Sequence, residues 1–122
     1  MTTKLNINQE EERYEIGTWL RMLDYHQQEN VYVKTRIAEI VKGTVTRETL
    51  ERLEYYQSLF LNKDAVIVLL RREIAQLSDT IKNKETVEAA LSLLRKDIQR
   101  MDQEFSTLRA EFNNYIRTAI SS

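Results

Sequence analysis

The sequence predicts an all-α fold in which three long antiparallel helices form an up-down-up, coiled-coil-like bundle that assembles as a dimer. Apolar residues recur in steps of three and four, which is the repeat of helices that pack side by side. The 122 residues include no proline and only two glycines, so little interrupts helical backbone. We expect one domain over residues 1–122, with helices over about 8–42, 46–82 and 86–120.

Capping residues define the start of the first helix and the first turn. Asn8 can accept a hydrogen bond from an unpaired backbone N–H, and an acidic first turn follows it. Gly43 is expected to end this helix, because glycine adopts the left-handed conformation that closes a helix without steric cost. Thr46 is a second N-cap, and Val45 and Leu50 occupy the two positions of a hydrophobic staple.

The second turn is predicted from the phase of the apolar pattern, because glycine and proline are absent from residues 82–85. The apolar row of the second helix would reach positions 84 and 88 if the helix continued. Lys84 and Glu88 stand there instead, and the row resumes out of step at Val87. We therefore place the break near residues 83–86. The alternative is one helix of more than about 70 residues that pairs in a long dimer.

The third helix carries the most regular pattern in the chain. Its apolar or near-apolar positions follow one another in unbroken steps of four and three, and they are Val87, Leu91, Leu94, Ile98, Met101, Phe105, Leu108, Phe112, Tyr115 and Ala119. This stripe predicts a helix that lies along the other two and packs its side chains between theirs.

A polar layer interrupts the apolar faces of the first two helices near their middles. Its candidate members are His26, Gln27, Asn30, Gln57 and Asp64. One interpretation is that buried polar groups penalise slipped packings and so specify the register of the helices. A second is a ligand or proton site, and a third is simple exposure of these side chains to solvent. If the first turn folds the two helices back on each other, Asn30 faces Gln57 and His26 comes close to Asp64, which would raise the pKa of His26.

The second helix has more apolar residues than a three-helix core can cover. Beside its inward stripe we expect a self-association surface made of Tyr55, Leu59, Leu61, Val66, Val68 and Leu69. Tyr25, Val31 and Tyr32 of the first helix are expected to border it. A second copy related by a two-fold axis is the simplest cover. Internal burial through rotation of the helices and a different protein partner are the alternatives.

Composition argues against several classes of function. The 18 basic and 19 acidic residues are intermixed, so we expect no nucleic-acid partner and no membrane-surface partner. With one histidine and no cysteine, we expect no metal, no cofactor and no nucleophilic triad. No apolar run is long enough for a signal peptide or a membrane span, and the absence of cysteine fits a reducing compartment, so we expect a cytoplasmic protein.

The Trp19-Leu20 pair in a long first helix, followed by two further helices, resembles spectrin-type three-helix repeats. The resemblance implies architecture alone, because the chain holds no tandem copy, and we assign no family from it. From the residues we expect a non-enzymatic, intracellular protein that acts by self-association and by helix-face contacts with other protein chains. The alternative is a regulatory or sensor bundle that binds a small ligand or a proton at the polar layer.

Overall fold

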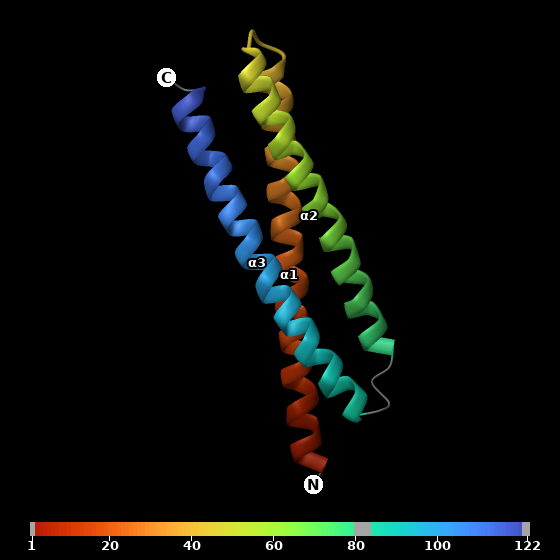
Figure 1. Ribbon diagram of the computed structural model, residues 1–122. Coiled ribbons are helices and arrows are strands. Elements are labelled where there is room, and N and C mark those ends of the chain that lie inside the picture. Colours follow the sequence, from red (N-terminus) through yellow and green to blue (C-terminus); the bar gives the residue numbers. More distant parts are fainter. Residues whose placement is uncertain (1, 80–83, 121–122) are drawn as a thin grey trace.

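The computed structural model describes the backbone of residues 2–79 and 84–120, and the burial of side chains 10–77 and 88–120. Three helices make up this part of the chain: α1 (Thr2–Val41), α2 (Arg47–Asp79) and α3 (Lys84–Ala119). Figure 1 shows α2 running back along α1, and α3 running in the direction of α1 again. The predicted all-α, three-helix, up-down-up architecture is therefore confirmed, and the alternative of a single rod is wrong.

The start of α1 differs from the prediction. The helix begins at Thr2, so Asn8 lies inside it and is not its N-cap. Asparagine lowers helix stability only modestly relative to most residues, and neither glycine nor proline precedes Gly17, so nothing in this segment forces a helix to begin later.

The first turn has the predicted cap at Thr46 but a different helix end at Gly43. The Thr46 Oγ1 accepts a hydrogen bond from the backbone N–H of Thr49 at 3.1 Å, as an N-cap does. Gly43 donates its N–H to the carbonyl of Ile40 at 3.1 Å, and it does not have a positive φ. A tightened last turn of this kind gives a hydrogen-bond partner to a backbone carbonyl at the end of the helix. The left-handed residue that we expected is therefore not needed. Leu50, the predicted staple residue, is 37% exposed.

On either side of the predicted second turn, α2 ends at Asp79 and α3 begins at Lys84. Of the predicted break at residues 83–86, position 83 lies outside the described residues, and the later positions already belong to α3. The phase of the apolar pattern thus located the reversal to within about one helical turn.

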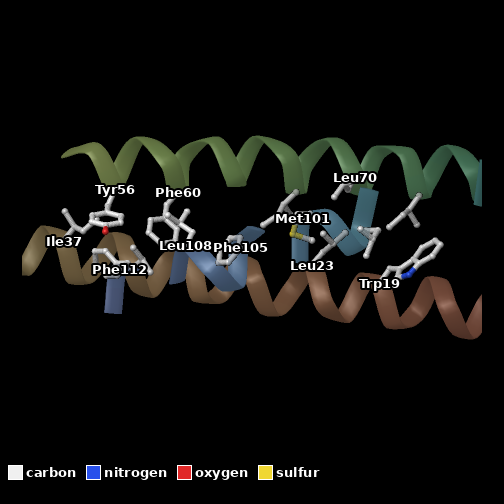
Figure 2. Close-up of a cluster of buried hydrophobic side chains, with 14 of the residues drawn as sticks. Trp19, Leu23, Ile37, Tyr56, Phe60, Leu70, Met101, Phe105, Leu108 and Phe112 are labelled. Carbon is white, nitrogen blue, oxygen red and sulfur yellow. The ribbon is translucent and has the colours of Figure 1, made fainter. Parts of the chain in front are cut away.

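The core follows the regular stripe of α3 (Figure 2). Every stripe position from Leu91 to Phe112 is buried, whereas Tyr115 is half-buried and Ala119 is exposed, so that Ile116 continues the core toward the end of the helix. Val87 lies outside the residues whose burial is described. Phe60 of α2 packs edge-on against both Phe105 and Phe112, with ring centroids 5.9 and 5.6 Å apart.

The three helices do not approach one another equally. α2 packs closely against both neighbours, and α1 and α3 approach each other less closely. Ion pairs span the wider α1–α3 seam, including Arg95 with Glu15 at 2.7 Å and Arg109 with Glu29. In both pairs the two residues are 80 positions apart in the sequence. A constant separation of this kind is what two helices that run in the same direction require.

Candidate functional site

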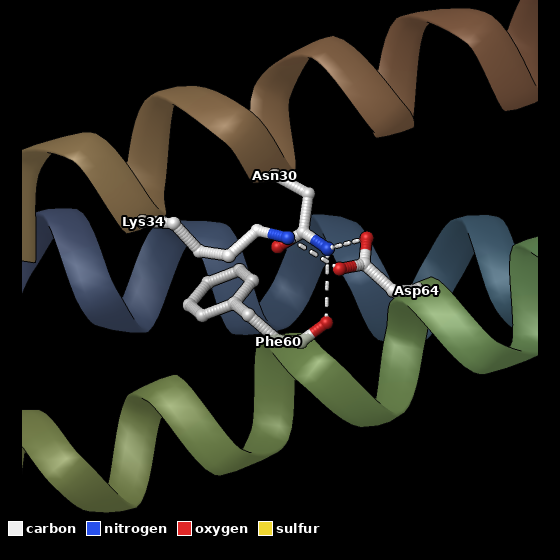
Figure 3. A network of polar contacts seen from close by, with 4 residues as sticks. All are labelled: Asn30, Lys34, Phe60 and Asp64. Carbon is white, nitrogen blue, oxygen red and sulfur yellow. Dashed lines mark hydrogen bonds and ion pairs between the residues drawn. The ribbon is translucent and has the colours of Figure 1, made fainter.

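Asn30 is the centre of the polar layer. Its side chain is fully buried, and its Nδ2 donates to the carbonyl of Phe60 at 2.9 Å and to the carboxylate of Asp64 (Figure 3). Lys34, one turn along α1, places its Nζ 2.5 Å from the other oxygen of that carboxylate. The Asp64 carboxylate therefore has a cationic partner as well as a neutral donor, which reduces the cost of its partial burial.

His26 belongs to the layer but pairs with a different carboxylate from the one predicted. Its Nε2 lies 2.8 Å from Oδ1 of Asp102, on α3, and Asp64 is held by Asn30 and Lys34 instead. The His26 ring also packs on Phe105, with centroids 4.5 Å apart. The imidazole thus faces the α1–α3 seam, and the predicted contact with Asp64 is wrong.

The two glutamines of the predicted layer are exposed. Gln27 accepts a hydrogen bond from Arg71 at 2.9 Å, at the edge of the α1–α2 seam. Gln57 points to solvent, and its neighbour Tyr56 is buried in its place. Asn30 meets Phe60 and Asp64 because the register of α1 on α2 differs by about one turn from the predicted one.

Sequence reasoning missed Lys34 and Asp102 as members of the layer. Both lie next to positions of the buried rows, Lys34 after Val33 and Asp102 after Met101. Charged residues that flank a core row are the natural partners of a buried polar group, because a long or partly exposed side chain can reach it. A search of these flanking positions would have found them.

Two buried polar atoms in the layer lack a hydrogen-bond partner. They are Nδ1 of His26 and Oδ1 of Asn30, which lie one helical turn apart on α1. When Nε2 of a neutral imidazole donates to Asp102, Nδ1 is an acceptor, as Oδ1 of Asn30 always is. Each of the two atoms can therefore accept a hydrogen bond that the described side chains do not supply.

Charged pairs at the rim of the bundle shift the pKa of two groups. The hydrogen bond from Lys63 at 2.7 Å lowers the pKa of Glu104, and the nearby positive charge of Lys63 acts in the same direction. The hydrogen bond to Glu15 raises the pKa of Arg95 above its ordinary value. Within the described residues, no group of three His, Asp or Glu side chains is placed to hold a metal ion.

The wider α1–α3 seam also contains a surface groove of about 760 Å³. Its rim is acidic, with Glu11, Glu12 and Glu88, and its floor includes Trp19 and Leu91. Both floor residues are already buried within the bundle core, so the groove offers little new apolar surface to a ligand.

The predicted self-association residues of α2 separate into two groups. Leu59 and Val66 are partly buried and pack against the core. Tyr55, Leu61, Val68 and Leu69 are each at least half exposed. The α1 residues Tyr25, Val31 and Tyr32 are exposed as well, and the guanidinium of Arg109 lies 5.5 Å from the Tyr32 ring centre.

We call the set Leu61, Ala65, Val68 and Leu69 the outer α2 face. All four side chains are exposed, and their spacing of four, seven and eight residues from Leu61 places them on one side of the helix. The buried rows of α2, which include Phe60 and Ile67, occupy the opposite side. The helix thus has a second apolar side that the bundle does not use.

No described helix is long and apolar enough to span a bilayer. The chain matches no protein-family model, and comparisons with curated proteins and with solved structures give no significant match.

Proposed function

We propose that this chain is a non-enzymatic protein-interaction module that acts by self-association and by helix-face contacts with other protein chains. The observation that supports the proposal is the outer α2 face, on which three large aliphatic side chains are at least half exposed around Ala65. Contiguous apolar surface of this kind marks interfaces in soluble proteins. Two exposed charged residues of the same helix, Glu54 and Arg72, lie on either side of the face along α2.

The energetic argument is the removal of these side chains from water. Full burial of an aliphatic side chain contributes about 1.5–3 kcal/mol, and about half of that remains available for a side chain that is half exposed. Two faces that meet contribute twice this gain. Association must overcome the loss of translational and rotational freedom, so well-packed contacts in the centre of the interface decide the affinity.

Sedimentation analysis and light scattering of the wild-type chain and of two variants test this proposal. We expect a concentration-dependent species above the 14.5 kDa monomer. Leu61→Glu and Leu69→Glu should each weaken association by at least about tenfold, because the interface would then bury a carboxylate.

Leu93→Glu is the matched control for these variants. Leu93 is 66% exposed on α3, so this substitution adds the same charge away from the outer α2 face. Circular dichroism should give equal helix content for all four proteins. A wild-type chain that stays monomeric up to high micromolar concentration would contradict the proposal.

A second function is favoured by the unpartnered Nδ1 of His26 and Oδ1 of Asn30. We propose as the alternative that the polar layer binds a small molecule that donates two hydrogen bonds, or a proton, and so reports on its surroundings. Imidazole ¹⁵N resonances of His26, followed in ammonium chloride against sodium chloride at one fixed pH, test it. A saturable, ammonium-specific shift supports this function, and resonances that respond equally to the two salts overturn it.

A further inference from the structure

We propose that the outer α2 face is covered by the outer α2 face of a second copy, packed antiparallel about a two-fold axis close to Ala65. This inference rests on the proposed self-association and adds its orientation and register. Three observations carry it: the symmetric spacing of the apolar residues, the small residue at their centre, and the different charges at the two ends of the face.

Three of the four residues of the face, Leu61, Ala65 and Leu69, are spaced symmetrically about Ala65. Leu61 and Leu69 lie four residues before and after it, which is one helical turn in each direction. When two such helices cross antiparallel at Ala65, Leu61 of one copy meets Leu69 of the other, and the reciprocal contact forms at the same time. A two-fold interface requires this self-complementarity.

The centre of the face permits a close approach. Ala65 is exposed and carries only a methyl group, so two copies of α2 can come near each other there while the leucines interlock on both sides. The contacts of α2 with α1 and α3 include those of its buried row, where Phe60 meets Asn30 and Phe105. The second copy can therefore dock without displacing either helix.

Charge selects the antiparallel orientation over the parallel one. Glu54 lies on the N-terminal side of the face and Arg72 on its C-terminal side, and both are exposed. Among the described ion pairs, none involves Glu54 or Arg72. A parallel pair would bring Arg72 against Arg72 and Glu54 against Glu54.

The antiparallel pair instead places Arg72 beside the second copy's Ser58, one turn from its Glu54. One turn is about 5.4 Å along the axis, which the long arginine side chain can span. The interface therefore gains two equivalent ion pairs across its two ends, and like charges stay apart.

The relative orientation of the two α2 helices can be measured with spin labels. The chain contains no cysteine, so one introduced cysteine is the single site of labelling in each copy. Glu48→Cys carries a single nitroxide label on the exposed N-terminal turn of α2. In the antiparallel dimer the two labels lie about 50 Å apart, since each is 17 residues from Ala65 at about 1.5 Å per residue. A parallel dimer places the two helix axes about 8–10 Å apart along their length, so the labels would lie within about 20 Å.

A charge exchange tests the register independently. Glu54→Arg and Arg72→Glu should each weaken association by about tenfold, because each places like charges together at both ends of the interface. The double variant restores opposite charges and should recover most of the wild-type affinity. Glu48→Arg, on the same helix but outside the proposed contact, is the matched control and should change affinity less than either.

The outcomes separate this inference from the proposed function. A long interspin distance together with recovery in the double variant supports the antiparallel register. A chain that associates and is disrupted by Leu69→Glu, but gives a short interspin distance, overturns the register and leaves self-association standing. A double variant whose loss of affinity equals the sum of the losses of the two single variants also overturns the register, and it likewise leaves self-association standing. A chain that does not associate overturns both.

Discussion

His26 of α1 and Asp102 of α3 are joined across the widest seam of the bundle, with Nε2 of the imidazole 2.8 Å from Oδ1 of the carboxylate. The imidazole is buried, whereas the carboxylate side chain is 42% exposed. This contact links the two helices that approach each other least closely. It also gives a partner to one nitrogen of a histidine that would otherwise be buried with both of its nitrogens unsatisfied.

The first prediction concerns this pair. Asp102→Ala should lower the free energy of unfolding by about 1–2 kcal/mol, because it leaves a buried imidazole nitrogen without a partner. His26→Leu combined with Asp102→Ala should lower it by less, since both polar groups are then removed. Urea denaturation at one fixed protein concentration measures both values. Equal or larger destabilisation in the double variant would show that His26 contributes through packing on Phe105 and not through Asp102.

The second prediction separates Asn30 from Gln57, which the sequence pattern placed in the same layer. Asn30→Ala should lower the free energy of unfolding by about 2 kcal/mol, because Asp64 and the Phe60 carbonyl lose a buried donor. Gln57→Ala should change it by less than about 0.5 kcal/mol, since the Gln57 side chain is exposed. The same urea experiment compares the two variants. Similar losses for both would mean that Gln57 belongs to the layer after all.

The third prediction concerns the aromatic centre of the core. Phe60 is fully buried between Phe105 and Phe112, so Phe60→Leu should lower the free energy of unfolding by about 1–2 kcal/mol. Leu93→Ala removes apolar atoms from an exposed site and should stay within about 0.5 kcal/mol of wild type. Thermal and urea unfolding followed by circular dichroism test the contrast. A loss at Leu93 that matches the loss at Phe60 would contradict this description of the core.

The fourth prediction is a pH dependence that arises from Glu104. Its pKa in the folded chain is lowered from the ordinary value of 4.5 by the hydrogen bond from Lys63. A lowered folded pKa means that the carboxylate stabilises the fold above its unfolded pKa, and that this contribution is lost as the pH falls through the folded value. Because the Glu104 side chain is 54% exposed, we expect a contribution of only about 0.5 kcal/mol.

Glu104→Gln tests this dependence. The variant should be less stable than wild type at about pH 7, and the difference should shrink as the pH falls through the lowered folded pKa of Glu104, below which the carboxyl is protonated in both folded and unfolded chains. Added salt should reduce the difference at neutral pH. A difference that does not change with pH would show that the Lys63–Glu104 pair does not stabilise the fold by its charge.

The buried faces of the helices could largely be predicted from periodicity. Trp19, Leu23, Val33 and Ile37 of α1 lie in the core as their spacing indicates. The error at Gln57 arose because both it and Tyr56 fit a step of three or four between Leu53 and Phe60. The sequence pattern places Gln57 in the inward row, whereas the structure buries Tyr56, which removes a large apolar ring from water.

The partners within the polar layer could not be predicted in the same way. A shift of one turn between two helices leaves the same rows facing each other, so the apolar pattern does not distinguish the alternatives. It does change the polar partners, because Asn30 meets the Phe60 carbonyl and the Asp64 carboxylate, three and seven residues beyond Gln57. The layer could be recognised from its residue types, but its hydrogen bonds could not.

By itself, the sequence determined that this chain forms three long helices, which rows of α3 are buried, and that α2 carries more apolar surface than its own bundle covers. These properties depend on residues a few positions apart on one helix, and the 3.5-residue repeat encodes them directly. Only the tertiary structure decided that His26 meets Asp102 and that Lys34 meets Asp64. Such contacts depend on the axial register and tilt of whole helices, which are set by the geometry of the turns and by the packing of all three helices together.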